Sequence, residues 1–245
     1  MTQIPKIIHQ IFFQGEAAVP EKYRRYHQTV LQNHPDWKHQ FWDEAKARKF
    51  MSENYLWFLP IFDAYPYDIQ RRDAIRYFIL YHYGGFYLDM DVECLKPLDD
   101  LLGDFELVLS KLVGFSNAIM GSIPRHPLWL KIFEELQKRQ DNLDNKTMPF
   151  YVGYSTGPII FNDCVVAGKF HENHTVRVCP GYIFEPGVPM ELNGKIFKSK
   201  LISETYTIHH MTTSWLPIKH RIIRVLFGII LEPYWFFCSL RKGKV

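Results

Sequence analysis

The sequence predicts an α/β domain with a mostly parallel sheet, and three observations support this class. Short apolar segments alternate with segments of helical periodicity through the first half of the chain. The chain has 245 residues, 47% of them hydrophobic, which suffices for one domain with a sizeable core. The clearest helical segment, 68–83, ends at Gly84-Gly85, and an alternating segment follows directly.

The expected elements follow from the period of the apolar residues. Ile75, Phe78, Ile79 and Tyr83 recur at helical spacing within 68–83. Further helices are expected at 21–33, 44–55, 125–140 and 158–167, and further strands at 4–13, 39–42, 105–112, 117–121, 176–184 and 205–211.

Two local signals refine these elements. Asp43 precedes the segment 44–55 and is expected to cap its N-terminus. In the segment 86–92 apolar and polar residues alternate, which predicts a strand. Its polar face carries Tyr87, Asp89, Asp91 and Glu93.

Composition argues against a nucleic-acid-binding protein and against a protein stabilised by zinc or disulfides. The formal net charge is only +3 and basic residues cluster only near the C-terminus, so no nucleic-acid partner is expected. The four cysteines, Cys94, Cys164, Cys179 and Cys238, are widely spaced. Their spacing indicates neither a zinc site nor a disulfide framework, and reduced, mostly buried thiols are expected.

The two ends of the chain lead to expectations about location. The N-terminus opens directly into an apolar segment without a charged leader, which predicts neither a secretory signal nor an N-terminal anchor, and hence a cytoplasmic location. From about Ile218, basic residues surround an apolar run too short to span a bilayer. Residues 218–245 are therefore expected to form a tail at a membrane interface, with packing on the domain of residues 1–217 or a dimer contact as alternatives.

Asp89-Met90-Asp91 is the most informative triplet. Two carboxylates on one face at the end of a strand can both reach one hard divalent cation, Mn²⁺ or Mg²⁺, which prefers oxygen ligands. A metal that bridges a diphosphate neutralises the charge that grows on the leaving group in nucleotide-sugar transfer. Taken alone, the triplet also fits a solvated turn.

The context of the triplet resembles a known family. The segment from Arg72 to Asp91 closely resembles the signature of glycosyltransferase family 32, in which D-x-x-R on a helix is followed by G-G-x-Y-x-D-x-D. These are relatives of the yeast initiating α-1,6-mannosyltransferase, they include capsular and surface polysaccharide glycosyltransferases, and they are distantly related to the clostridial glucosylating toxins.

Two further segments carry the same resemblance. Residues 4–12 resemble the opening strand I-P-K-I-I-H-Q-x-W, with Phe12 where the family usually has Trp. Residues 208–215 resemble the closing H-H-x-x-G-S-W, with Thr213 in place of Gly. The resemblance spans about residues 4–216.

The resemblance implies a GT-A-type fold and a metal-dependent, retaining transfer of a hexose-type sugar. The donor would be a UDP- or GDP-linked sugar, and the acceptor a hydroxyl group. With the expected tail at a membrane, the acceptor is expected to be a glycan or glycolipid in the assembly of surface polysaccharide or glycolipid.

The resemblance also implies the metal ligands. Asp91 is expected to bind the metal directly and Asp89 to bridge the metal and the ribose. His209 and His210 alternate on a strand, so only one can face the metal. His210 is favoured because it resembles the histidine of an H-x-x-G metal motif, and His209 is the alternate.

Other residues would hold the donor. The resemblance implies that Asp73 and Arg76, which share a helix face, grip hydroxyls of the donor sugar, and Arg76 could also meet phosphate oxygens. Phe12 would stack on the nucleobase, and Tyr87 would touch the donor. The structural alternatives are an intrahelical salt bridge for the Asp73–Arg76 pair and core packing for the two aromatic residues.

The same resemblance implies roles for two further groups of residues. Ser214 and Trp215 would hold the diphosphate or the metal loop. Asn117, Thr156 and Gly157 resemble family segments beside the acceptor cleft, although Thr156 and Gly157 also fit a plain helix start before a proline.

Other functions receive less support. A phosphotransferase or hydrolase could use an Asp-bound metal, but the sequence contains neither G-x-x-x-x-G-K-[ST] nor H-E-x-x-H. No G-x-G-x-x-G follows a strand, which disfavours a Rossmann dehydrogenase. A catalytically inactive, membrane-associated nucleotide-sugar-binding protein is the main alternative, and the intact acidic and Arg76 positions favour the transferase.

Overall fold

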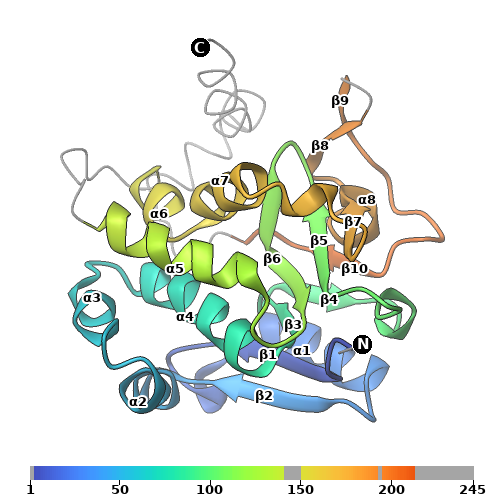
Figure 1. Cartoon of the computed structure of the whole chain (residues 1–245). Helices are drawn as coiled ribbons and strands as arrows, with labels where there is room; N and C mark the ends of the chain where they lie inside the picture. The colour runs from blue at the N-terminus through green and yellow to red at the C-terminus, as the bar shows by residue number, and fades with distance from the viewer. Residues whose placement is uncertain (1–2, 141–149, 193–194, 213–245) are drawn as a thin grey trace.

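The computed structural model describes residues 3–140, 150–192 and 195–212. Its centre is a six-stranded sheet of order β2-β1-β3-β6-β5-β7 (Figure 1). The strands are β1 (Ile7–Ile11), β2 (Lys38–Trp42), β3 (Gly85–Leu88), β5 (Leu107–Lys111), β6 (Phe115–Ser122) and β7 (Val176–Pro180). Neighbours pair in parallel except around β6, which runs antiparallel to β3 and β5. The predicted α/β class with a mostly parallel sheet is confirmed.

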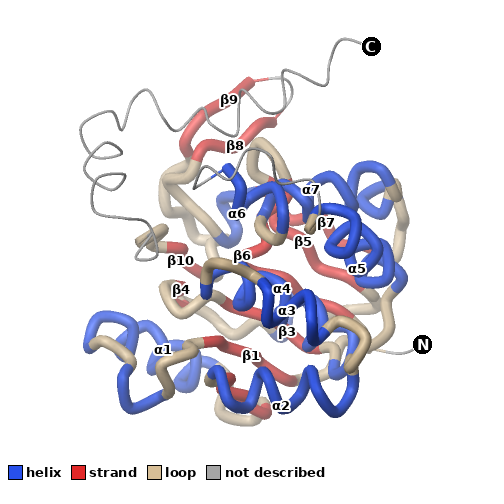
Figure 2. The backbone as a smooth tube through the Cα atoms, turned by 90° about the vertical axis from the view of Figure 1, so that its left-hand side faces the viewer, coloured by secondary structure: helices blue, strands red, loops and turns tan. Residues whose placement is uncertain are grey.

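Helices cover both faces of this sheet (Figure 2). The larger helical layer contains α2 (Glu44–Asn54), α3 (Leu59–Ala64), α4 (Asp68–Tyr83), α5 (Pro127–Arg139), α6 (Phe150–Ser155) and α7 (Pro158–Ala167). The opposite face carries α1 (Glu21–Asn33), α8 (Gly181–Phe184) and a small sheet of β4 (Val92–Cys94) and β10 (Thr207–His209).

Short elements complete the described chain. Three 3-10 turns lie at Glu16–Ala18, Asp99–Leu101 and Phe170–Glu172. The hairpin of β8 (Pro189–Leu192) and β9 (Lys195–Lys198) projects at the upper right of Figure 1. Among the described residues no helix combines the length and the apolar character that crossing a bilayer would require.

The core has two parts, one on each side of the sheet. Helix α4 is buried almost all round, and its Phe78 ring stacks on Phe133 of α5 with centroids 4.0 Å apart. Tyr77 of α4 lies parallel to Phe161 of α7 at 6.0 Å. On the other face Ile8, Phe86 and Leu88 pack with Val30 of α1 and Phe184 of α8, among others. Burial of these apolar surfaces on both faces is the main force that holds the three layers together.

Several local predictions are confirmed. Helix α4 has the predicted bounds 68–83. The Asp43 side chain accepts a hydrogen bond of 2.7 Å from the Lys46 N–H and so caps α2. Cys94, Cys164 and Cys179 are free and buried, as expected, while Cys238 lies outside the described residues.

Two predicted strands are shorter than expected. The segment 86–92 is not one strand, because the Val92 N–H donates to the Asp89 carbonyl at 3.1 Å and closes a turn between β3 and β4. The segment 176–184 ends as a strand at Pro180, and 181–184 forms the short helix α8 instead. Proline lacks the N–H that would continue the ladder at that point.

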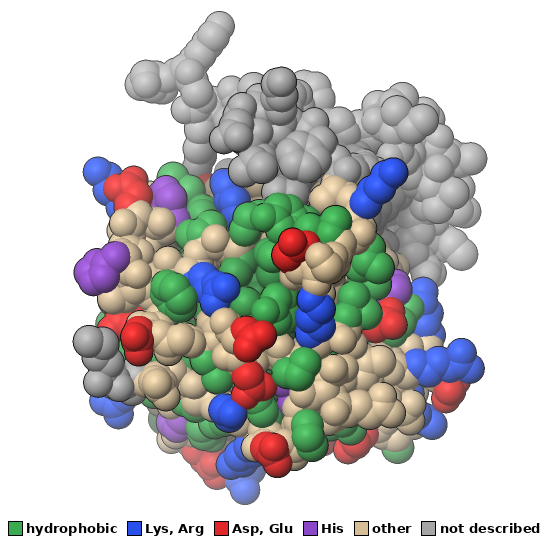
Figure 3. Space-filling model, turned by 90° about the vertical axis from the view of Figure 1, so that its right-hand side faces the viewer, with side chains coloured by type: hydrophobic (Ala, Val, Ile, Leu, Met, Phe, Trp, Pro, Cys, Tyr) green, Lys and Arg blue, Asp and Glu red, His purple; other side chains and the backbone are tan. Residues whose placement is uncertain are grey.

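On one face of the molecule the charged side chains are spread rather than gathered. On the face seen from the right-hand side of Figure 1, acidic and basic side chains are interspersed with hydrophobic ones (Figure 3). This distribution agrees with the small formal net charge of +3. The predicted tail of residues 218–245 lies outside the described residues.

Candidate active site

A pair of glycines sets the position of the acidic triplet. Gly84 and Gly85 have φ values of +64° and +89°, which other residues rarely adopt. A Cβ atom on Gly85 would lie 2.4 Å from the Ile7 carbonyl oxygen, so only glycine lets β3 approach β1 this closely. At the other end of β3 the Asp89 N–H donates to the Ala118 carbonyl of β6 at 2.9 Å. Asp89 therefore leaves the sheet at a defined place.

Asp89 and Asp91 meet one histidine from a distant part of the chain. One side-chain ligand atom each of Asp89, Asp91 and His209 lie within 4.8 Å of one another. The His209 Nε2 is 3.2 Å from Asp91 Oδ1 and 3.9 Å from Asp89 Oδ2. The pairing of β10 with β4, which sets His209 opposite Val92, brings these residues together.

The neighbouring histidine points elsewhere. The His210 Nε2 lies 2.8 Å from Glu93 Oε2, and its ring stacks on Tyr26 of α1 at 4.1 Å. Sequence reasoning favoured His210 as the metal ligand, but the structure places the alternate, His209, beside the aspartates. Adjacent residues leave a strand on opposite sides, and the register of β10 on β4 decides which side meets Asp91.

The second oxygen of Asp91 is bound by the loop after β10. The Thr212 N–H and hydroxyl both donate to Asp91 Oδ2 at 2.8 Å. Burial alone would raise the pKa of Asp91, but hydrogen bonds from His209 and Thr212 outweigh it and lower this pKa well below its usual range. Asp91 is thus held ionised, as a metal ligand must be.

Phe12 lies next to this loop. Its half-buried ring meets Tyr23 of α1 edge-on at 6.5 Å, and the Tyr23 hydroxyl lies 2.8 Å from the Thr212 hydroxyl oxygen. The structure therefore places Phe12 on the side of the site formed by α1 and residue 212. Ser214 and Trp215, two and three positions further along, lie outside the described residues.

Arg76 connects the acidic triplet to α4. Its guanidinium lies 2.7 Å from Asp73 Oδ1 and 3.3 Å from Asp89 Oδ1, and it donates to the Asn117 carbonyl at 2.9 Å. Its carbon Cζ also lies 4.5 Å from the centre of the Tyr87 ring, whose hydroxyl donates to Asp89 at 2.5 Å. The predicted Asp73–Arg76 pair is thus a buried pair in contact with the triplet.

Burial controls the charges of this group. Asp73 is 5% exposed, and burial raises its pKa to about 7 although Arg76 opposes the shift. Burial also raises the pKa of Asp89, with Arg76 again opposing. Arg76, at 3% exposure, stays charged because Asp89, Tyr87 and Asp73 outweigh its own desolvation and raise its pKa.

The three residues predicted on the acceptor side gather behind Asp73. The Asn117 amide donates to the Tyr77 hydroxyl at 2.9 Å, and this hydroxyl donates to the Thr156 carbonyl at 2.9 Å. A Cβ atom on Gly157 would lie 3.2 Å from Asp73 Oδ2. The start of α7 therefore lies directly against the Asp73 carboxylate.

Sequence reasoning missed Glu185. It follows α8, is 1% exposed, and its Oε1 lies 2.8 Å from His209 Nδ1. Burial would lower the pKa of His209, but Asp91 and Glu185 outweigh it and raise this pKa to about 10 without a metal. No motif marks Glu185, because only the fold brings it to His209.

The group of Asp89, Asp91 and His209 fits a divalent metal ion. Two carboxylate oxygens and one imidazole nitrogen suit Mn²⁺ or a similar cation, and three protein ligands leave positions for substrate oxygens. The side chains are 24%, 14% and 8% exposed, so the group opens to solvent on the aspartate side.

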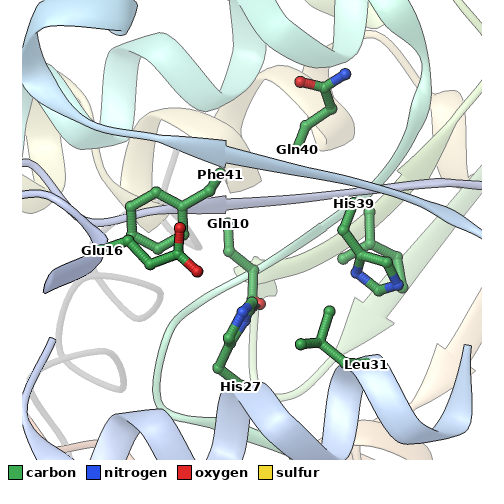
Figure 4. A pocket seen from close by; sticks show the side chains of 8 residues that line it. Gln10, Glu16, His27, Leu31, His39, Gln40 and Phe41 are labelled. Carbon is green, nitrogen blue, oxygen red and sulfur yellow. Dashed lines mark hydrogen bonds between the residues drawn. The ribbon is translucent and has the colours of Figure 1, made fainter. Parts of the chain in front are cut away.

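A separate cavity of about 190 Å³ lies between α1 and the strands β1 and β2 (Figure 4). Gln10 and His27 point toward each other across it, with 2.6 Å between the Gln10 Oε1 and His27 Nδ1 atoms. None of the residues predicted for the site lines this cavity.

The chain is similar in sequence to known glycosyltransferases. Residues 20–108, which include Asp73, Arg76 and both aspartates of the triplet, match the family described as the glycosyltransferase sugar-binding region containing DXD motif. The chain is 35% identical over 192 residues to inositol phosphoceramide mannosyltransferase 1 of Schizosaccharomyces pombe, covering 76% of this chain and 59% of that protein. It is 47% identical over 192 residues to mannosyl phosphorylinositol ceramide synthase SUR1 of Saccharomyces cerevisiae, covering 73% of this chain and 47% of that protein.

The chain thus spans about half the length of these relatives. Among solved structures it resembles the PaToxG glycosyltransferase, with a TM-score of 0.53, 18% identity, and coverage of 70% of this chain and 71% of that one. This likeness concerns the fold, and the expected GT-A-type fold is confirmed.

Proposed function

The chain belongs to the glycosyltransferase family with the DXD-containing sugar-binding region, and from this membership we propose that it is a metal-dependent, retaining hexosyltransferase. It would move a sugar from a nucleotide-diphosphate donor to a hydroxyl of a glycan or glycolipid. The observation that carries the proposal is the convergence of Asp89, Asp91 and His209 within 4.8 Å, beside the buried Asp73–Arg76 pair.

The metal-binding role falls to Asp91, Asp89 and His209. When bound, a divalent cation would neutralise the negative charge that develops on the departing diphosphate. Thr212 and Glu185 hold Asp91 and His209 from behind, and Tyr87 and Arg76 hold Asp89. The ligand atoms are therefore oriented before the donor arrives, which lowers the cost of reorganisation.

The sugar-binding role falls to Asp73 and Arg76. A carboxylate held by a guanidinium, at the edge of the acidic triplet, can accept hydrogen bonds from sugar hydroxyls. The Asp73 Oδ2 lies against the backbone of Gly157, where a larger residue would crowd it. Phe12, half-buried near Tyr23, would stack on the nucleobase.

The reaction we propose is front-face displacement. The acceptor oxygen attacks the anomeric carbon from the side on which the diphosphate departs, so one carbon–oxygen bond forms as the other breaks and configuration is retained. The acceptor proton passes to a diphosphate oxygen. Each carboxylate around the site already has partners: Asp73 and Asp89 bind Arg76, and Asp91 and Glu185 bind His209. Their proposed task is therefore binding and orientation rather than covalent attack.

The names of the relatives suggest the first substrates to test. They point to mannose as the sugar and to a phosphorylinositol ceramide as the acceptor. A sugar hydroxyl on a lipid-linked head group agrees with the glycolipid acceptor expected from the sequence.

The test is a donor screen on the purified chain. UDP- and GDP-sugars, GDP-mannose among them, are incubated with glycolipid acceptors, with Mn²⁺ or with a chelator, and released nucleotide is measured. We expect release from one donor that requires metal and vanishes in Asp91→Asn. Asp63→Asn, which alters an exposed carboxylate paired with Arg48, should keep the full rate. Tight donor binding without turnover on any acceptor would instead identify an inactive nucleotide-sugar-binding protein.

A further inference from the structure

We propose that Glu185 is a positioning residue for the metal site: it holds the His209 ring so that Nε2, rather than Nδ1, faces Asp89 and Asp91. The inference rests on the proposed function only in taking a divalent cation as the occupant of that group. Neither the family motif, whose match ends at residue 108, nor the sequence pattern includes Glu185.

The hydrogen bond to His209 defines which ring nitrogen is free. An ionised carboxylate only accepts hydrogen bonds, so the Glu185 Oε1, 2.8 Å from Nδ1, requires Nδ1 to carry a proton. Nε2 is then the nitrogen with a lone pair when the ring is neutral, and it is the atom 3.2 Å from Asp91 Oδ1. Carboxylates behind metal-binding histidines orient the ring and strengthen it as a ligand in this manner.

Two serines hold the carboxylate itself. Ser110 of β5 donates to Glu185 Oε2 at 2.6 Å, and Ser116 of β6 donates to Oε1 at 3.0 Å. The β5–β6 register shifts between Leu109 and Ser110, and beyond this irregularity Ser110 lies opposite Ser116. Such irregularities redirect side chains, and here both hydroxyls reach one buried carboxylate. These donors offset the cost of removing the charge from water.

The backbone around Glu185 is tied to the strand that carries His209. The Thr207 hydroxyl of β10 donates to the Phe184 carbonyl at 2.7 Å, and the Thr205 hydroxyl donates to the Tyr182 carbonyl at 2.9 Å. Both bonds join residues that directly precede Glu185 and His209 in the chain, so α8 and the segment that leads into β10 are fastened together on one side of the Glu185–His209 contact. The serines hold the carboxylate and these bonds hold the backbone before it, so Glu185 has few ways to move when a metal binds.

A second Glu–His pair in the chain serves as a comparison for Glu185 and His209. Glu93 and His210 have the same chemistry and the same 2.8 Å separation, but their side chains are 31% and 28% exposed. Glu185 and His209 are 1% and 8% exposed. The buried pair faces the aspartates and the exposed pair faces Tyr26, so a matched substitution in each pair separates positioning from general loss of charge.

The experiment measures Mn²⁺ binding by electron paramagnetic resonance, with and without UDP or GDP, and needs no turnover. Glu185→Gln preserves the shape of the side chain but removes its charge, and we expect the Mn²⁺ affinity to fall by about 10- to 100-fold. Glu93→Gln should leave the affinity unchanged. Equal affinity in wild type and Glu185→Gln, or an equal loss in both variants, would overturn the proposal.

A second measurement needs no substitution of Glu185. Nitrogen-15 NMR of the wild type loaded with diamagnetic Zn²⁺ should show His209 bound through Nε2 and protonated at Nδ1. In the Ser110→Ala/Ser116→Ala double variant, a smaller share of His209 should be protonated at Nδ1. The Mn²⁺ affinity of this variant should fall, as it does in Glu185→Gln. Protonation at Nε2, or a wild type that binds no Mn²⁺, would refute the inference. If Mn²⁺ binds and Glu185→Gln weakens it while no donor turns over, the positioning role stands and the proposed transferase function fails.

Discussion

Arg76 shows how one side chain organises the charges of the site. It is 3% exposed and lies between two carboxylates, those of Asp73 and Asp89. A buried cation between two anions is stable only as a set, because each charge compensates the desolvation of the others. The planar guanidinium can hold both carboxylates and the Asn117 carbonyl at once, which a lysine ammonium would do less well.

Removal of this cation should therefore destabilise the fold as well as the site. Arg76→Ala leaves Asp73 and Asp89 buried without their cation, and we expect the free energy of unfolding to fall by about 3–5 kcal/mol. Arg48→Ala removes a guanidinium of the same kind from an exposed pair with Asp63 and should leave the unfolding midpoint unchanged. Urea denaturation of both variants checks this, and similar midpoints would show that the Arg76 group is not a coupled set.

At the scale of elements, the junction between α4 and β3 determines where the acidic triplet lies. Helix α4 ends at Tyr83, two glycines turn the chain, and β3 begins at Gly85. The His9 ring nitrogen Nε2 lies 2.9 Å from the Gly84 carbonyl and ties the turn to β1. The triplet follows after only four strand residues, so an error at the junction would move Asp89 directly.

Gly187, which has a similar φ but open space around it, allows a matched test of Gly85 at this junction. Gly85 and Gly187 both have positive φ, +89° and +83°, but only Gly85 has backbone within clashing distance of an added Cβ. Gly187→Ala should cost about 1–2 kcal/mol through strain alone. Gly85→Ala should cost more than about 4 kcal/mol, since the Ile7 carbonyl cannot yield without separating β1 from β3. Thermal unfolding of both variants measures the difference, and equal costs would contradict the close approach of the strands.

At the scale of the molecule, the interior encloses neutral histidines. His9 is fully buried on β1, and burial lowers its pKa to about 3. His126 is 2% exposed, caps α5 by accepting from the Leu128 N–H at 3.3 Å, and burial lowers its pKa to about 4. A histidine that is neutral in the folded state and protonated in the unfolded state makes stability fall with acidification.

The sign and range of this effect follow from the His126 pKa. Its contribution is complete above the unfolded value of 6.5 and is lost as the pH falls towards about 4, because only the unfolded chain takes up the proton. His126→Asn keeps a capping oxygen and does not titrate. Between pH 7 and pH 5 the wild type should lose about 2 kcal/mol more unfolding free energy than His126→Asn. If the unfolding free energies of the two proteins, measured in urea, changed equally with pH, this would contradict a buried, neutral His126.

Much of the fold could be predicted from local patterns. The bounds of helix 68–83, the Asp43 cap and the mostly parallel sheet depend on periodicity and on residues close in sequence, which act alike in most proteins. The segments 86–92 and 176–184 were wrong as single strands because turn closure at Val92 and the missing N–H of Pro180 are finer than the apolar pattern.

The sequence by itself determined the fold class, the resemblance to a glycosyltransferase family and the local spacing of the acidic and basic motif residues, because each depends on patterns among residues close in sequence. Only the tertiary structure decided which histidine lies beside Asp91 and that Glu185 stands behind it. The register of β10 on β4, over a hundred residues apart, selects His209, and the irregular β5–β6 pairing aims two serines at Glu185. These choices depend on how distant strands align, and a shift of one residue would exchange the two faces.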